Sequence, residues 1–149
     1  MNVNNITEEP LAADVRDELR QYESAALSAL KLGSVRADED VVVEAINKFA
    51  DSLLASDAEV DTELATQLAV LWGHQICRRL GWEWVKLTVQ GDMWYGIVSR
   101  RREYAIFPLI YMREVLAERS KDNTILLIYN MLKAGKFSPA EAGDYYVLE

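Results

Sequence analysis

In the first half of the chain, hydrophobic residues recur at intervals of three and four, which places them on one face of an α-helix. A first helix is predicted to begin at Thr7, where a capping hydroxyl is followed by Glu8, Glu9 and Pro10. The apolar positions continue to Leu30, and a glycine three residues later ends the segment. The pattern therefore predicts a helical start to the fold.

Two more helices are predicted before the pattern changes. One begins near Asp38 and has its apolar face over the residues up to Leu53. The next runs from about Asp57 to Leu80 and ends at Gly81. Its apolar side is widened by small residues, which is typical of a central helix that packs on several neighbours.

After Gly81 the apolar period falls from about 3.6 to 2, which indicates a half-buried β-strand. Gly91 and Asp92 fit a two-residue hairpin loop with glycine first, the preference of a type II′ turn. The predicted register then pairs Gln90 with Met93, Val89 with Trp94, Leu87 with Gly96, and Val85 with Val98.

The remaining elements are a third strand and two helices. The strand is predicted over Tyr104–Phe107, and Pro108 opens a helix that reaches Arg119. Asp122 or Asn123 caps a last helix, residues 124–133. We therefore expect an α+β fold: three N-terminal helices, a three-stranded antiparallel β-meander, and two C-terminal helices packed on one sheet face.

Size and composition are those of one globular domain. The 149 residues form a helical part (about 7–80), the meander (about 82–107), the C-terminal helices (about 108–134) and a tail (135–149). The single cysteine excludes an internal disulfide, which is compatible with a reducing compartment. No signal-peptide pattern and no apolar run near 18 residues is present. We expect a cytoplasmic bacterial protein that does not enter a membrane.

The net charge of −8 is unevenly distributed. Residues 1–63 carry 15 acidic and 5 basic side chains, whereas residues 64–149 carry 9 acidic and 11 basic ones. An acidic half argues against nucleic acid as the partner, because that interface needs clustered Lys and Arg. The acids are either a solvated helical surface or a surface that docks a basic partner. For the second interpretation the candidate residues are Asp57, Glu59, Asp61 and Glu63.

All four tryptophans fall between positions 72 and 94. The predicted register puts Trp94 on the strand face assigned to the core, and Trp72 and Trp82 are also expected to pack inside. Trp84 and Tyr95 lie on the opposite face. That face is either covered by the C-terminal tail or open as an aromatic patch for a partner.

Two segments, WGHQICRRLGWEWVKL and REYAIFPLIYMREVLAERS, resemble an uncharacterised family of bacterial domains, the domain of unknown function numbered 3806. The resemblance covers about residues 64–133. The positions that carry it are Gly73, Gly81, Trp84, Phe107, Pro108, Leu109, and Arg113 or Arg119. It implies an α+β domain and supplies no catalytic residues. In composition and general style, the chain is also similar to the immunity proteins that neutralise toxins.

Few residues suggest chemistry. His74 and Cys77 stand one helical turn apart, but a structural zinc site needs about four ligands and no second pair of this kind exists. The glycines are scattered, so no phosphate-binding loop is predicted and no cofactor is expected. Arg100, Arg101 and Arg102 form either a solvated connection or a contact for an anion or an acidic partner.

Two classes of function follow. The first is a non-catalytic protein-binding module, in one version an immunity protein that covers a basic surface of a toxin. The second is an enzymatic or small-ligand-binding domain with a pocket between the third helix and the meander, using His74, Glu83 or the arginines. The sequence leaves the identity of the partner and the oligomeric state open, a homo-oligomer included.

Overall fold

The computed structural model describes residues 5–33 and 37–148. The strands within these residues are β1 (Ile6–Pro10), β2 (Glu83–Val89), β3 (Asp92–Val98), β4 (Tyr104–Ile106) and β5 (Tyr146–Val147). The helices are α1 (Ala13–Ala29), α2 (Glu39–Leu54), α3 (Thr62–Leu80), α4 (Pro108–Met112) and α5 (Ile125–Ala134). A π-helical turn, η1 (Arg113–Ala117), continues α4. The α+β class is confirmed.

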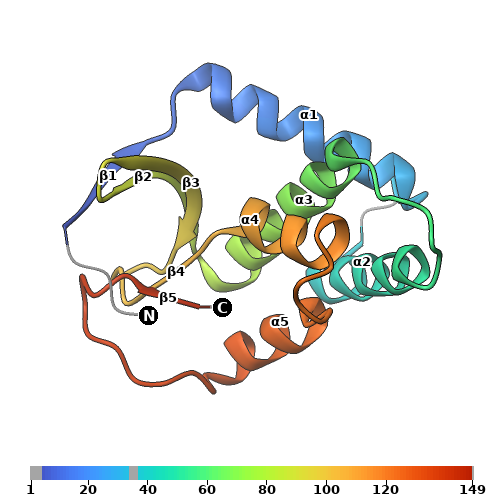
Figure 1. Cartoon of the computed structure of the whole chain (residues 1–149). Coiled ribbons are helices and arrows are strands. Elements are labelled where there is room, and N and C mark those ends of the chain that lie inside the picture. Colours follow the sequence, from blue (N-terminus) through green and yellow to red (C-terminus); the bar gives the residue numbers. More distant parts are fainter. Residues whose placement is uncertain (1–4, 34–36, 149) are drawn as a thin grey trace.

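The sheet is mixed and has the order β1-β2-β3-β4-β5. Neighbouring strands in the sheet are antiparallel, except β4 and β5, which run parallel to each other. The predicted meander is therefore its centre, and both outer strands come from segments for which no strand was predicted. The tail supplies β5, which places the C-terminal segment beside β4 (Figure 1).

The predicted start of the first helix is wrong, because residues 6–10 form β1. Their backbone pairs with β2, from Ile6 opposite Val89 to Pro10 opposite Val85. Glu8 and Glu9 are thus strand residues rather than first-turn acids, and α1 begins only after Ala12. Charged side chains and a terminal proline are compatible with this strand because it is a sheet edge.

In the hairpin between β2 and β3, the pairing register is shifted by two residues from the predicted one. Val89 pairs with Asp92, so the two loop residues are Gln90 and Gly91. Both have positive φ, 51° and 86°, as a type I′ turn requires. A shift of two residues preserves side-chain alternation, so Trp84 and Tyr95 share one face, as predicted, and Trp94 shares the other with Leu87.

The helix boundaries follow capping chemistry. Asp38 precedes α2 and its carboxylate accepts from the Val41 N–H at 2.9 Å, as predicted. The third helix begins at Thr62 rather than near Asp57, because the Asp61 carboxylate caps it by accepting from the Glu63 N–H at 3.0 Å. Gly81 ends this helix with φ of 73°, a left-handed conformation that glycine adopts without strain.

The helices gather on one side of the sheet (Figure 1). Helix α3 is central, as predicted: it packs against α1, α2, α4, η1 and α5. The main core includes the fully buried Trp72, Leu68 and Ile76 of this helix, and Ile97 and Ile106 reach it from the sheet. The helix-covered face is therefore the one that carries Trp84, Tyr95 and Ile97.

The other sheet face has a smaller core of its own, formed by Val85, Leu87, Val98 and Ala105 with partly buried neighbours from strands and loops. Trp94 belongs to this face but is 38% exposed, so its predicted burial is wrong. The reason is its place in the strand. β4 pairs only with Ile97 and Val98, so within the described residues no strand lies beside the first half of β3 on that side.

Candidate functional site

A cleft of about 280 Å³ opens where the N-terminal end of α3 meets β3 and α4. We call it the aromatic cleft. Its lining residues are Thr62, Ala65, Thr66, Met93, Trp94, Tyr95, Leu109, Ile110 and Arg113. Met93 and Trp94 are 45% and 38% exposed, which is unusual for side chains of this size. Large apolar side chains at the mouth of a concave surface are typical of a binding site.

The local sequence explains why these side chains stay exposed. The adjacent apolar residues Met93 and Trp94 interrupt the alternation of β3 and stand just after the hairpin turn. Neither has a partner strand on the β4 side. Arg113 reaches the cleft from the first position of the π-helical turn, a type of turn that is frequent at functional sites.

The cleft has little net charge of its own. The Arg113 guanidinium donates from Nε to Oε2 of Glu118 at 2.9 Å, so its charge is offset by an adjacent carboxylate. The other lining side chains are apolar or uncharged. The cleft is therefore suited to an apolar group of a ligand or partner rather than to an anion.

The predicted acidic segment adjoins this cleft at its C-terminal end. Asp57 and Glu59 lie in the connection from α2 to α3, Asp61 caps α3, and Glu63 lies in its first turn, next to the lining residue Thr62. All four side chains are exposed, and none forms an ion pair with any residue that the structure describes. The segment is thus a group of exposed carboxylates without ion pairs to described residues, and its C-terminal end adjoins the cleft.

The connection that carries these acids is held in place by Arg119. Its Nη2 donates to the carbonyl oxygens of Ser56 and Ala58, each at 3.0 Å. Because this guanidinium binds carbonyl groups, it orders the connection without forming an ion pair with Asp57 or Glu59.

The structure brings Tyr95 to the aromatic cleft but not Trp84. Trp84 packs on α3, where its ring lies against Gly73 and its centroid is 5.9 Å from that of His74. It is half-buried by helices, while the tail lies at the far edge of the sheet. Helices cover this face around Trp84, and Tyr146 and Leu148 of the tail pack against the same core.

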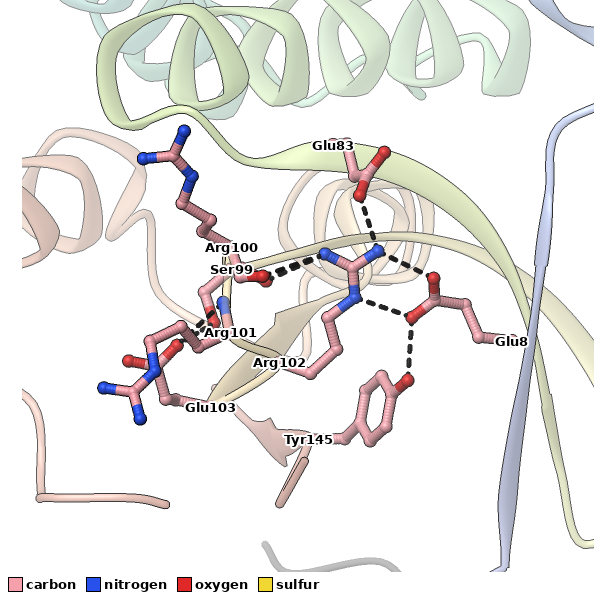
Figure 2. A network of polar contacts seen from close by, with 8 residues as sticks. All are labelled: Glu8, Glu83, Ser99, Arg100, Arg101, Arg102, Glu103 and Tyr145. Atoms are coloured by element: carbon pink, nitrogen blue, oxygen red, sulfur yellow. Dashed lines mark hydrogen bonds and ion pairs between the residues drawn. The ribbon is translucent and has the colours of Figure 1, made fainter. Parts of the chain in front are cut away.

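The three arginines have different environments (Figure 2). Arg102 donates from Nε and Nη2 to the two carboxylate oxygens of Glu8, at 2.8 and 2.7 Å, and also pairs with Glu83. Tyr145 donates to the same Glu8 carboxylate at 2.7 Å. The side chains of Arg100 and Arg101 point away from this network and are exposed. Only these two are available to an anion or an acidic partner.

These contacts shift the pKa values of Glu8 and Tyr145 in opposite directions. The hydrogen bonds from Arg102 hold the pKa of the Glu8 carboxyl below its usual range. Burial, together with donation to Glu8, raises the pKa of Tyr145 to about 12. We call the group of Glu8, Glu83, Arg102 and Tyr145 the Arg102 network. It joins β1, β2, the loop after β3 and the tail.

His74 and Cys77 have structural roles in α3. The Nδ1–H of His74 donates to the carbonyl oxygen of Val70 at 2.8 Å. Burial raises the pKa of the Cys77 thiol to about 12, so it is a weak nucleophile at neutral pH. Among residues 5–33 and 37–148, no three His, Cys, Asp or Glu side chains are placed to hold a metal ion. The same part of the chain contains no helix of the length and apolarity needed to cross a membrane.

Several members of the cleft were not predicted from the sequence. Met93 was assigned to the hairpin and Trp94 to the core, and no role was predicted for Thr62 or Thr66. The available signal was the Met93-Trp94 pair, since two adjacent large apolar residues in a strand cannot both face the same core. Their meeting with Arg113 depends on tertiary packing of α3 on α4.

Comparisons with known proteins show a fold likeness alone. No protein-family model matches the chain, so the resemblance to family 3806 gains no support, and no curated protein matches it in sequence. A solved structure of a Bacteroides thetaiotaomicron protein superposes with a TM-score of 0.66 at 12% identity, over 89% of this chain. This chain spans 49% of that one, about half its length. The fold of this protein is therefore similar to part of a larger bacterial protein.

Proposed function

We propose that this protein is a non-catalytic binding module whose aromatic cleft and acidic segment together dock a basic protein. One observation carries the proposal: Asp57, Glu59, Asp61 and Glu63 have no ion-pair partner among the described residues, and the segment leads into the cleft lining, where Asp61 and Glu63 flank Thr62. Such an arrangement supplies both of the components that protein interfaces use, an apolar anchor and a charged rim.

The two components have separate tasks in this proposal. Trp94 and Met93 form the anchor, because binding energy concentrates on large side chains that become fully desolvated on contact. The four carboxylates attract Lys and Arg side chains of the partner and accelerate the encounter, an effect that salt screens. Arg113 adds no repulsion because Glu118 already neutralises it.

Toxin neutralisation is the specific form of this function that we propose. An inhibitor of this kind acts by covering a basic active site, so it needs surface complementarity and no catalytic residues. The high pKa of Cys77 and the backbone-bound Nδ1 of His74 are in keeping with a chain that performs no nucleophilic chemistry.

The test uses two variants with equal changes in charge. The first neutralises the acidic segment, with Asp57→Asn, Glu59→Gln and Glu63→Gln, and leaves the Asp61 cap intact. The control neutralises Asp14, Glu44 and Glu141, which are exposed, lie elsewhere and have no ion-pair partner among the described residues. Each variant, the wild type and Trp94→Ala are used as bait in the native lysate at low and moderate salt.

We expect the wild type and the control variant to capture the same basic protein at low salt, in equal and stoichiometric amounts. Its association rate with the acidic-segment variant should fall about tenfold or more, and Trp94→Ala should speed its dissociation. If both charge variants capture the protein at the same rate, the acidic segment has no role. If the captured protein inhibits growth unless this chain is present, toxin neutralisation is the activity.

A further inference from the structure

A second cavity lies on another side of α3, where α1 passes over β2. Its volume is about 290 Å³ and it shares no lining residue with the aromatic cleft. Leu11 and Leu19 form one wall, which is apolar. The rings of His74 and Trp84 form a second wall, with their centroids 5.9 Å apart and their planes inclined at 47°. We call it the α1 pocket.

The charges around this pocket leave it positive. Arg16 and Arg20 line it from successive turns of α1. Arg16 forms no ion pair with any described residue, and Arg20 pairs only with Asp17, at a site where both side chains are largely exposed. A positive hollow is unexpected in a protein whose net charge is −8.

The nearby carboxylates are already engaged by other arginines. Glu83, the acidic lining residue, pairs with Arg102. Glu23 pairs with Arg78 at 2.8 Å and lies 4.0 Å from Nδ1 of His74. Arg16 has no ion-pair partner among the described residues, and the exposed Arg20–Asp17 pair is weak, so both guanidinium groups have capacity for a carboxylate from outside.

His74 adds a second polar position. Its Nδ1–H is committed to the Val70 carbonyl, which fixes the ring in one orientation. The Nε2 atom has no hydrogen-bond partner among the described residues, so it can interact with a ligand in addition to the guanidinium groups.

We propose that the α1 pocket binds a small aromatic carboxylate. The ring of the ligand would occupy the hollow between the Leu11 and Leu19 side chains and the Trp84 indole, while its carboxylate meets the guanidinium groups of Arg16 and Arg20. The volume limits the ligand to one or two fused rings, since sites for drug-sized molecules begin at about 300 Å³. This site is independent of the aromatic cleft and of the protein partner proposed for it.

The experiment titrates the ¹⁵N-labelled full chain with indole-3-carboxylate and, as the uncharged isostere, indole-3-carboxamide. The readout is the Trp84 Nε1–H resonance, assigned by its loss in Trp84→Phe, with dissociation constants from calorimetry. Ligand is added up to about 10 mM, where a site with a Kd of about 1 mM is nearly saturated.

The carboxylate should shift the Trp84 resonance in a saturable way and bind about tenfold or more tightly than the carboxamide. The double variant Arg16→Gln, Arg20→Gln should bind the carboxylate about tenfold or more weakly than the wild type does. Arg113→Gln, which changes the aromatic cleft instead, should leave binding unchanged. Because both arginines are exposed on α1, the double variant is expected to fold, and an unchanged spectrum without ligand checks this.

Three results would overturn the proposal. The first is a Trp84 resonance that does not move over the whole titration. The second is equal affinity for the acid and the amide, which would show that the charge has no part in binding. The third is full affinity in the arginine double variant. None of them bears on the aromatic cleft, so the protein-binding function would stand or fall separately.

Discussion

Gly73 on α3 and Trp84 on β2 are in direct contact, and the missing side chain at position 73 is what makes room for the indole. A Cβ atom built at Gly73 would overlap Cζ2 of Trp84 and lie 3.2 Å from Cγ of Pro108. Helix α3, strand β2 and helix α4 therefore approach each other closely at a residue without a side chain.

Gly73→Ala should consequently destabilise the fold, although alanine is the better helix former. The gain in helix propensity is about 1 kcal/mol, whereas forcing a methyl group into a packed site costs about 1–3 kcal/mol. We expect a lower free energy of unfolding in urea and a changed Trp84 emission. In a Trp84→Phe background, which removes the overlapping ring atoms, the same substitution should become neutral or stabilising. If Gly73→Ala lowered the free energy of unfolding equally in both backgrounds, the indole would not be the obstacle.

Arg102→Gln should cost about 1–3 kcal/mol, because it leaves the Glu8 carboxylate partly buried without its cation. The matched control is Arg101→Gln at the neighbouring position, where the side chain is exposed and the expected change is within about 0.5 kcal/mol. Denaturation in urea measures both. Equal effects would mean that the Arg102 network contributes nothing beyond a surface charge.

The contribution of Glu8 to stability should depend on pH. Its folded pKa lies below the ordinary value of 4.5, because the carboxylate accepts hydrogen bonds from Arg102. The ionised form therefore stabilises the fold at pH above about 4.5, and this contribution is lost as the pH falls through the folded pKa. The difference in unfolding free energy between wild type and Glu8→Gln should be constant near neutral pH and shrink in acid. A difference that grows on acidification would contradict the assignment.

Cys77 should react slowly with thiol reagents in the native protein. Burial raises its pKa from the ordinary 9.0 to about 12, so at pH 8 the reactive thiolate is about a thousandfold scarcer than in an unperturbed thiol. Labelling with a chromogenic disulfide should take hours when the protein is folded and be complete within minutes in denaturant. Rapid labelling of the native chain would mean that this part of α3 opens to solvent.

The sequence predicted elements whose signals are local. The helices around Asp38 and Gly81 follow from capping residues, and the β2–β3 hairpin follows from alternation and a glycine turn. β1 was missed because Thr7 to Pro10 reads locally as a helix start, whereas the observed strand exists only through pairing with β2, far along the chain. Local preference is a weak guide where a remote partner supplies the hydrogen bonds.

The candidate sites show the same limit. Alternation along β3 correctly separates Trp94 from Tyr95, but it cannot tell which face the helices cover. Glu8, Arg102 and Tyr145 meet across most of the length of the chain, so neither their ion pairs nor their shifted pKa values leave a sequence pattern. The acidic segment was recognisable from its spacing, whereas the apolar cleft beside it emerges only from packing of α3 on α4.

The place of β1 in the sheet also has a consequence for synthesis on the ribosome. Ile6 is made about 80 residues before its partner Val89. At about 5–20 residues per second, the nascent N-terminal segment waits roughly 4–17 seconds before any strand exists for it to join. During that time Glu8 has neither Arg102 nor Tyr145 to bind, so the edge of the sheet and its ion pairs are completed only after Tyr145 has been made.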